Sequence, residues 1–141
     1  MRNARPLRLA GPSGTQEAQV AFGPVGERCL LTVTLEDGRS ISAEESDYFE
    51  SLLSVRRQLE RDGIVVCCQG ARRDVWPSGM ARDMGAGLEA YALTIGRRPT
   101  QDDLVDIFDP VERALVGTVA EQERQFKKWR EWRASLRASK G

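Results

Sequence analysis

Apolar and polar residues alternate between residues 28 and 42, which is the pattern of a β-hairpin. The residues on one side of the alternation are Cys29, Leu31, Val33 and Leu35. Neighbouring side chains of a strand point to opposite faces, so this spacing predicts a strand with one buried face. Asp37-Gly38 supplies a turn before the second strand at residues 40–42. A further short strand is predicted over Ala18–Phe22, which ends at Gly23-Pro24.

A helix is predicted directly after this hairpin. Ser42 and Glu45 have the spacing of a capping box, which favours a helix that begins near residue 43, and Gly63 predicts its end. Apolar residues in between recur every three or four positions and form one stripe: Tyr48, Phe49, Leu52, Leu53, Val55 and Leu59. The next apolar run, Ile64–Cys68, is short and β-branched and predicts a strand buried on both faces.

The second half of the chain predicts further strands and one long helix. Alternation over residues 88–95 predicts a strand that places Tyr91, Leu93 and Ile95 on one face. Leu104–Phe108 fits either a strand or a short helix, and Ala114–Val119 fits a strand. Thr118 with Glu121 is a second capping box, at the start of a last helix. The apolar stripe of that helix consists of Phe126, Trp129, Trp132 and Leu136.

These elements predict a single α+β domain with a mainly antiparallel sheet and two principal helices, because strands outnumber helices and turns join most of them. Residues 1–17 are rich in Arg, Gly, Pro and Ser without periodicity, so we expect a flexible N-terminal arm there. The domain is expected to cover residues 18–137, and residues 138–141 to form a C-terminal tail. A length of 141 residues suits one hydrophobic core.

Composition excludes several classes of enzyme. The sequence contains no His, which removes Ser-His and Cys-His catalysis and His-containing zinc sites. The three cysteines lack metal-ligand spacing, and Cys67 and Cys68 are adjacent, so reduced core thiols are predicted. No apolar stretch is long enough to span a bilayer. We therefore expect a cytoplasmic protein that uses no cofactor, metal or membrane.

A net charge of zero hides an uneven distribution of charge along the chain. Residues 124–141 contain seven basic residues and one acid, whereas residues 11–123 contain 11 basic and 20 acidic residues. The chain therefore has an acidic body and basic ends. Basic residues interleaved with Trp129 and Trp132 could bind nucleic acid, although a solvated helix face is the more common meaning of such a pattern.

The segment between the strands near Cys68 and Leu88 is too long for an ordinary loop. Unstructured connections beyond about 12–15 residues are uncommon in compact domains and are usually functional or disordered. Trp76, Met80 and Met84 are large apolar residues that could anchor residues 69–87, which makes disorder the weaker interpretation. Three arginines and two aspartates in the same segment could recognise carboxylates or phosphates.

Three interpretations of residues 69–87 remain open. In a structural one, Arg72 or Arg73 pairs with Asp83, and Arg82 pairs with Asp74. In a binding one, the segment is a partner-binding surface of the composition that hot spots favour. The residues of that surface are Arg72, Arg73, Asp74, Trp76, Met80, Arg82, Asp83 and Met84. The third is an anion-binding catalytic loop, but the segment lacks the ending of a phosphate-binding loop and a dinucleotide-binding fingerprint.

Residues 70–80 read GARRDVWPSGM and are followed by Arg82-Asp83-Met84-Gly85, by Tyr91 and by Asp103–Phe108. In these residues the chain resembles a group of small bacterial cytosolic proteins that is similar to the immunity proteins of polymorphic toxin systems. The resemblance covers about residues 44–132 and leaves residues 1–26 without a counterpart. It implies an immunity protein that is not an enzyme, and that binds one cognate toxin protein and neutralises it by stoichiometric inhibition.

The alternative function is a nucleic-acid or anion-binding accessory domain that uses the basic, Trp-containing C-terminal helix. Nucleic acid is the less expected partner, because the whole chain has no excess of positive charge. The sequence leaves the oligomeric state open.

Overall fold

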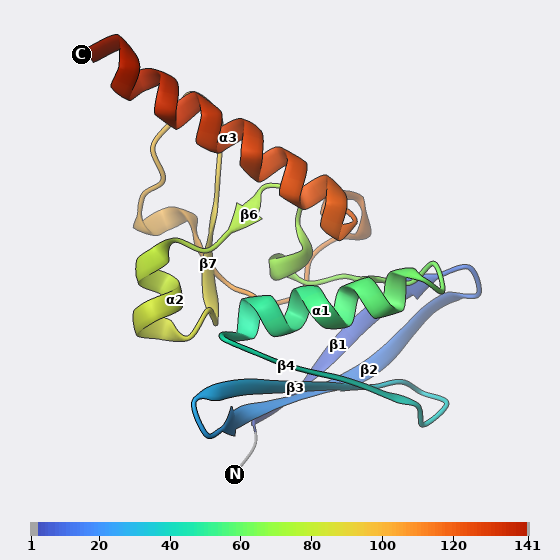
Figure 1. Ribbon diagram of the computed structural model, residues 1–141. Coiled ribbons are helices and arrows are strands. Elements are labelled where there is room, and N and C mark those ends of the chain that lie inside the picture. Colours follow the sequence, from blue (N-terminus) through green and yellow to red (C-terminus); the bar gives the residue numbers. More distant parts are fainter. Residues whose placement is uncertain (1–2, 141) are drawn as a thin grey trace.

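An antiparallel sheet from the N-terminal part of the chain forms the first layer of the fold (Figure 1). The computed structural model describes residues 3–140. Strands β1 (Asn3–Gly11), β2 (Gly14–Val25), β3 (Arg28–Thr34) and β4 (Ser40–Glu45) follow one another as a meander, and β5 (Val65–Val66) pairs with β1. The antiparallel pairing of β3 with β4 confirms the predicted hairpin over residues 28–42.

The N-terminal residues belong to this sheet, so the prediction of a flexible arm is wrong for residues 3–17. β1 pairs with β2 along its whole length. Leu7 and Leu9 lie in the hydrophobic core. Leu7 and Leu9 are the two fully buried residues of β1, so the alternation is too short to give a clear signal in the sequence, and pairing with a neighbouring strand overrides the weak local propensity. Residues 1 and 2 of the expected arm lie outside the described part of the chain.

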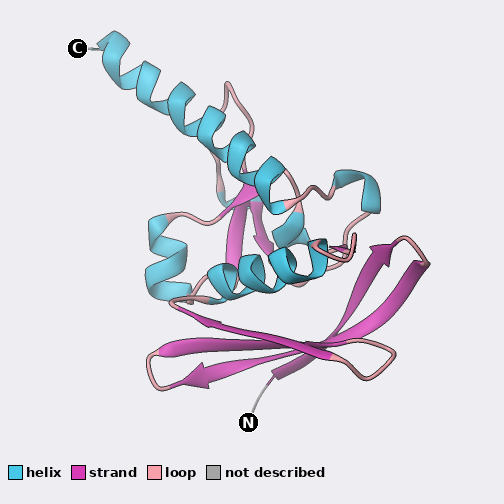
Figure 2. Cartoon of the chain, turned by 45° about the vertical axis from the view of Figure 1, so that its right-hand side comes forward, coloured by secondary structure: helices cyan, strands magenta, loops and turns pink. Residues whose placement is uncertain are grey.

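Helix α1 (Tyr48–Glu60) covers one face of the five-stranded sheet (Figure 2). Its apolar stripe is buried as predicted. The helix starts later than residue 43 because Asp47 caps it: the Asp47 carboxylate accepts the backbone N–H of Glu50 at 2.8 Å. Ser42, the predicted cap, lies in β4, where its hydroxyl is 2.7 Å from that of Thr32.

A second antiparallel sheet, in the order β6-β7-β8, forms in the second half of the chain. Its strands are β6 (Val75–Trp76), β7 (Glu89–Ala92) and β8 (Leu104–Asp106). β7 lies within the strand predicted over residues 88–95, and β8 shows that Leu104–Phe108 begins as a strand. Of Ile64–Cys68, only the two residues of β5 form a strand.

The strand predicted over Ala114–Val119 is wrong. Arg113–Leu115 form a 3₁₀ turn, and Val116 makes only an isolated bridge. The carbonyl groups of Ala114 and Val116, which a neighbouring strand would need, accept hydrogen bonds from the Arg73 guanidinium instead.

Helix α3 (Val119–Lys140) begins against the small sheet, and its C-terminal end extends beyond the rest of the molecule (Figures 1 and 2). The predicted capping box is confirmed: the N–H of Thr118 donates to Glu121 Oε1 at 2.8 Å, and the N–H of Glu121 donates to Thr118 Oγ1 at 3.1 Å. The tail expected at residues 138–141 is helical through Lys140, so that prediction is wrong there. Gly141 lies outside the described residues.

A buried polar cluster holds the start of α3 against α1. Arg56 of α1 is 1% exposed, and its guanidinium donates to Gln122 Oε1 and, at 3.0 Å, to the carbonyl of Gly117. Gln122 in turn donates to the carbonyls of Gly70 and Val75 at 2.9 and 2.8 Å. Burial lowers the pKa of Arg56. The cluster therefore fixes the direction in which α3 leaves the core.

The fold class is α+β, as predicted, with one hydrophobic core that draws on both sheets and on α1. A third, short helix, α2 (Gly79–Gly85), accompanies the two long ones. The three cysteines are buried and unpaired, in agreement with the prediction of reduced core thiols. Among the helices of residues 3–140, none combines the length and the apolar character needed to cross a bilayer.

Candidate functional site

Residues 69–87 form short structured pieces rather than an irregular loop. A 3₁₀ turn at Gln69–Ala71 is followed by β6 and then by α2. Ser78 caps α2, because its Oγ accepts the backbone N–H of Ala81 at 3.0 Å. Ala86 ends the helix in the left-handed region, at φ 54°. The segment therefore presents one face of a short helix to solvent.

The arginines at the start of the segment are engaged within the fold. Arg72 makes a bidentate ion pair with Asp74, at 2.9 and 2.8 Å. Arg73 donates to the carbonyls of Val116 and Ala114 at 2.7 and 2.6 Å. These contacts tie the residues before β6 to the chain that leads into α3.

Arg82 fixes α2 to the beginning of α1. Its guanidinium lies 2.8 Å from Asp47 Oδ2 and 3.0 Å from Glu50 Oε2. It also lies over the rings of Phe49 and Trp76, at 5.4 and 5.9 Å from their centroids. Arg82 is thus an ion-pair partner of the start of α1, and it also packs over the Phe49 and Trp76 rings.

The predicted ion pairs of the segment are therefore wrong in their partners. Neither Arg72 nor Arg73 pairs with Asp83, and Arg82 does not pair with Asp74. The spacing along the chain pointed to partners within the segment, whereas the carbonyls near Val116 and the acids at the start of α1 are brought in by the tertiary fold. Asp83 is exposed and makes no ion pair with the described residues.

The three large apolar residues of the segment have different roles. Trp76 is half-buried and packs edge-on against Phe49, with ring centroids 5.0 Å apart. Met80 and Met84 are 71% and 82% exposed, so the expectation that they anchor the segment is wrong. They lie on the solvent side of α2, one turn apart.

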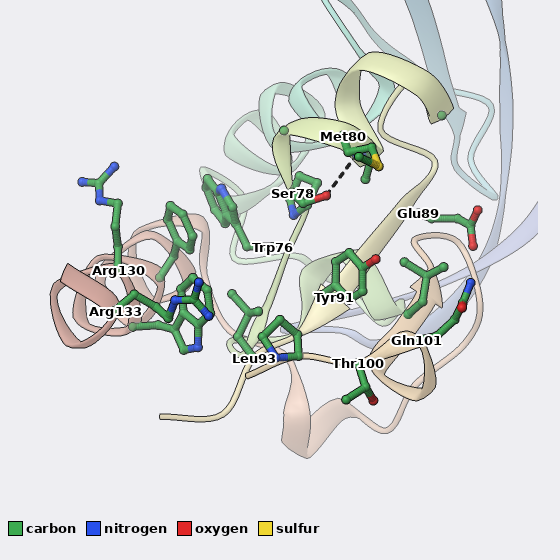
Figure 3. A pocket seen from close by; sticks show the side chains of 18 of the residues that line it. Trp76, Ser78, Met80, Glu89, Tyr91, Leu93, Thr100, Gln101, Arg130 and Arg133 are labelled. Atoms are coloured by element: carbon green, nitrogen blue, oxygen red, sulfur yellow. Dashed lines mark hydrogen bonds between the residues drawn. The ribbon is translucent and has the colours of Figure 1, made fainter. Parts of the chain in front are cut away.

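A hollow of about 1060 Å³ lies between α2, the small sheet and α3. We call it the α2–α3 groove. Figure 3 shows Ser78 and Met80 on one side, Arg130 and Arg133 of α3 on another, and Tyr91 and Leu93 between them. Its wall residues are mainly apolar, and they include Trp76, Met80, Met84, Tyr91, Leu93, Leu104, Phe126 and Trp129.

A row of aromatic rings runs from the core to the projecting part of α3. Trp76 stacks on Phe126, with centroids 4.7 Å apart and an interplanar angle of 10°. Phe126 is followed by Trp129 at 6.2 Å and Trp129 by Trp132 at 6.3 Å. Aromatic pairs at these separations add stability beyond their buried area. The row joins the segment of Trp76 to the apolar stripe predicted for the last helix.

Positive charge gathers on the α3 side of the groove. Arg130 lies over Phe126 and Arg133 over Trp129, at 5.5 and 5.4 Å from the ring centroids. Arg137 follows one turn later and also lines the groove. None of these three arginines forms an ion pair with a carboxylate of residues 3–140. Stacked guanidinium groups still present N–H donors at their edges, so this wall can receive acidic groups.

Within the described chain, no three His, Cys, Asp or Glu side chains are grouped so that they could hold a metal ion. Trp129 Nε1 is buried and has no hydrogen-bond partner among the described residues. A second, smaller hollow of about 590 Å³ adjoins the groove along α3 and shares Trp76, Leu93, Phe126 and Trp129 with it. It mixes basic and acidic side chains, Arg73, Arg124 and Lys128 with Asp74 and Glu121.

Sequence reasoning identified one wall of the groove and missed the other two as parts of a site. Of the eight candidate residues, Trp76, Met80 and Met84 line the groove, whereas Arg72, Arg73, Asp74, Arg82 and Asp83 do not. Arg130, Arg133 and Arg137 were visible as a basic run, and Tyr91 and Leu93 as one face of a strand. Nothing in the sequence placed these faces opposite α2.

Neither a known protein-family model nor a curated protein sequence matches this chain.

Proposed function

We propose that this protein acts by binding another protein through the α2–α3 groove. The observation that carries the proposal is the exposure of Met80 and Met84 beside a mainly apolar hollow with aromatic walls. Contiguous exposed apolar surface in a soluble fold commonly marks a binding site. Trp, Tyr, Met and Arg are also the residue types enriched where protein interfaces gain most of their affinity.

The partner that the sequence resemblance implies is a cognate bacterial toxin, neutralised by stoichiometric inhibition in the cytoplasm. Inhibition of this kind requires a complementary surface and no chemistry of its own. The groove supports this proposal because it offers a preformed apolar surface with polar edges, the usual anatomy of a specific interface.

Co-expression with a toxin tests the proposal directly. The probe is the toxin domain of the protein encoded beside this chain in its own genome. We expect the wild-type chain to restore growth and to form a 1:1 complex on size-exclusion chromatography. The double variant Met80→Ser/Met84→Ser is expected to lose both effects while it keeps the unfolding transition of the wild type, because both side chains are exposed.

Val25→Ser is the matched control, because Val25 is also an exposed apolar residue, at 46%, but lies in β2, outside the groove. We expect this variant to protect as well as the wild type. Full protection by the methionine variant would contradict the proposed surface, and absence of any complex with the wild type would contradict the proposed function.

A nucleic-acid or anion-binding role is the second candidate, and the observation that favours it is the exposed basic face of α3 with Trp129 and Trp132. Bases can stack on aromatic rings while arginines follow the phosphates. The acidic residues of the body oppose this role by repelling a polyanion. Several phosphate contacts would make binding fall steeply between about 50 and about 200 mM salt. Binding to single-stranded RNA with this salt dependence would support the role.

A further inference from the structure

We infer that the partner segment seated in the α2–α3 groove is an amphipathic helix with acidic residues along one flank. The inference rests on the proposed function and specifies the chemistry of the partner. Three features carry it: the one-sided positive charge of the groove, the paired edges of β7 and the volume of the groove.

The positive charge of the groove lies on one side. Arg130, Arg133 and Arg137 are spaced three and four residues apart, so they lie along one side of α3. The opposite wall carries Met80 and Met84, which have no charge, and the carboxylate among the lining residues is Glu89 of β7, away from α3 in Figure 3. A segment that lies between these walls therefore meets apolar side chains on one flank and unpaired guanidinium groups on the other. An acidic flank is the complement of the second wall.

The central strand of the groove floor, β7, has no edge free for an added strand. β7 supplies Tyr91, and its neighbours β6 and β8 pair with both of its edges, so the outer edges of the small sheet are those of β6 and β8. A peptide over this floor meets side chains rather than free backbone N–H and C=O groups. Its own backbone groups must then be satisfied internally, as they are in a helix.

The volume of the groove suits a short stretch of helix. A helix 10–12 Å across occupies roughly 400–600 Å³ per turn, so a hollow of 1060 Å³ holds about two turns. Drug-sized ligands usually occupy hollows of about 300–1,000 Å³, which puts this groove at the upper limit of that range.

A second copy of the chain fits the groove poorly. The projecting part of α3 is the helix that a neighbouring copy could most easily offer, and residues 124–141 carry seven basic residues and one acid. Two such helices side by side would bring like charges together. The charge argument therefore favours a different protein as the source of the helix.

Designed peptides test the inference without knowledge of the natural partner. The probe is a fluorescein-labelled 14-residue helical peptide with Leu or Phe at positions i, i+3, i+4 and i+7 and Glu along one flank. Two matched peptides replace every Glu with Gln or with Lys. We expect fluorescence anisotropy to show that the Glu peptide binds about tenfold more tightly than the Gln peptide, and the Lys peptide least of all.

Charge reversal in the protein supplies the reciprocal test. Arg133→Glu/Arg137→Glu is expected to weaken binding of the Glu peptide at least about tenfold and to improve binding of the Lys peptide. Lys127→Glu/Lys128→Glu is the matched control, with the same change in net charge on the same helix but outside the groove. We expect this control to change either affinity by less than about threefold at 150 mM salt.

The outcomes separate this inference from the proposed function. Equal binding of the three peptides, or equal effects of the two charge reversals, would overturn the inference that the partner segment is an acidic helix. So would tighter binding of a 12-nucleotide single-stranded RNA, or a concentration-dependent dimer that the arginine reversal abolishes. If the methionine variant loses toxin protection while the arginine reversal keeps it, the proposed function stands and the acidic helix is wrong.

Discussion

Arg56 and Arg57 are neighbours in α1 that occupy opposite environments. Arg56 is buried among neutral acceptors, whereas Arg57 is half-exposed and lies 3.6 Å from Glu123. Arg56→Met leaves Gln122 Oε1 and the carbonyl of Gly117 without their donor, and each buried unsatisfied acceptor costs about 1–3 kcal/mol. We expect urea denaturation to show a loss of about 2–4 kcal/mol in the free energy of unfolding.

Arg57→Met is the control for this prediction. Exposed ion pairs are worth about 0–1 kcal/mol, so the loss should be small. A similar loss for the two variants would mean that the buried hydrogen bonds of Arg56 add nothing beyond the packing of its side chain.

Position 87, between α2 and β7, requires glycine because of its backbone conformation and because of its close neighbours. Its φ is +74°, and an added Cβ would lie 2.8 Å from Asp47 Oδ1 and 3.0 Å from the backbone nitrogen of Phe49. Gly87→Ala should therefore destabilise the fold by about 1–3 kcal/mol, measured as a lower urea midpoint. It should also disturb the Asp47 cap of α1.

Gly79 is the control position for the Gly87→Ala prediction. It lies at the first position of α2, and an added Cβ would meet nothing within 4 Å. Gly79→Ala is expected to be neutral or slightly stabilising, because Ala has the higher helix propensity. Equal destabilisation by both alanines would contradict the role assigned to the backbone of Gly87.

At the scale of elements, the start of α3 gives a prediction about pH. The backbone N–H of Thr118 donates to Glu121 and lowers the pKa of that carboxyl below its ordinary value of 4.5. The folded state therefore favours the charged form, and this contribution to stability is complete above the ordinary pKa. It is lost as the pH falls through the lowered pKa of the folded state.

Glu121→Gln removes this contribution. Its stability, followed by urea denaturation, should fall less than that of the wild type as the pH decreases from about 5 to about 3. Glu131→Gln, an exposed change later in the same helix, is the control and should follow the wild-type profile. If the free energy of unfolding of Glu121→Gln changed with pH as steeply as that of the wild type, the Glu121 carboxyl would not contribute to the pH dependence of stability.

Elements with strong local signals were predictable from the sequence. The β3–β4 hairpin has an uninterrupted alternation and a two-residue turn signal, and α3 has a capping box that the structure retains. β1 was not predictable, because its alternation is limited to Leu7 and Leu9 and its strand conformation comes from pairing with β2. The start of α1 was misplaced because the same serine can cap a helix or lie in a strand.

The groove was predictable only in part, for a related reason. Sequence spacing identified Trp76, Met80 and Met84 as chemically unusual, but exposure decides which of them can meet a partner. Arg72 pairs with nearby Asp74, but Arg73 and Arg82 of the same segment contact partners 32 to 43 residues distant in the chain. Contacts over such separations are set by the fold and leave no local pattern.

At the scale of the whole molecule, the cysteines report on the integrity of the core. Burial raises the pKa of Cys68 to about 11 and also raises the pKa values of Cys29 and Cys67. Only about one Cys68 thiol in a thousand is then ionised at pH 8, and thiolates are the reactive form. We expect the native protein to be inert to a thiol reagent and all three cysteines to react in urea. Rapid modification of a native thiol would contradict the close packing of this core.

The groove is built entirely from the second half of the chain. All of its wall residues lie between Trp76 and Arg137, and none belongs to the five-stranded sheet or to α1. Most of the buried hydrophobic residues lie before Trp76. Substitutions at the exposed groove residues, such as Met80 and Met84, can therefore accumulate with little effect on folding, and this part of the surface can diverge as a partner changes. Exchange of residues 76–137 between homologous chains is then expected to transfer partner choice together with the segment.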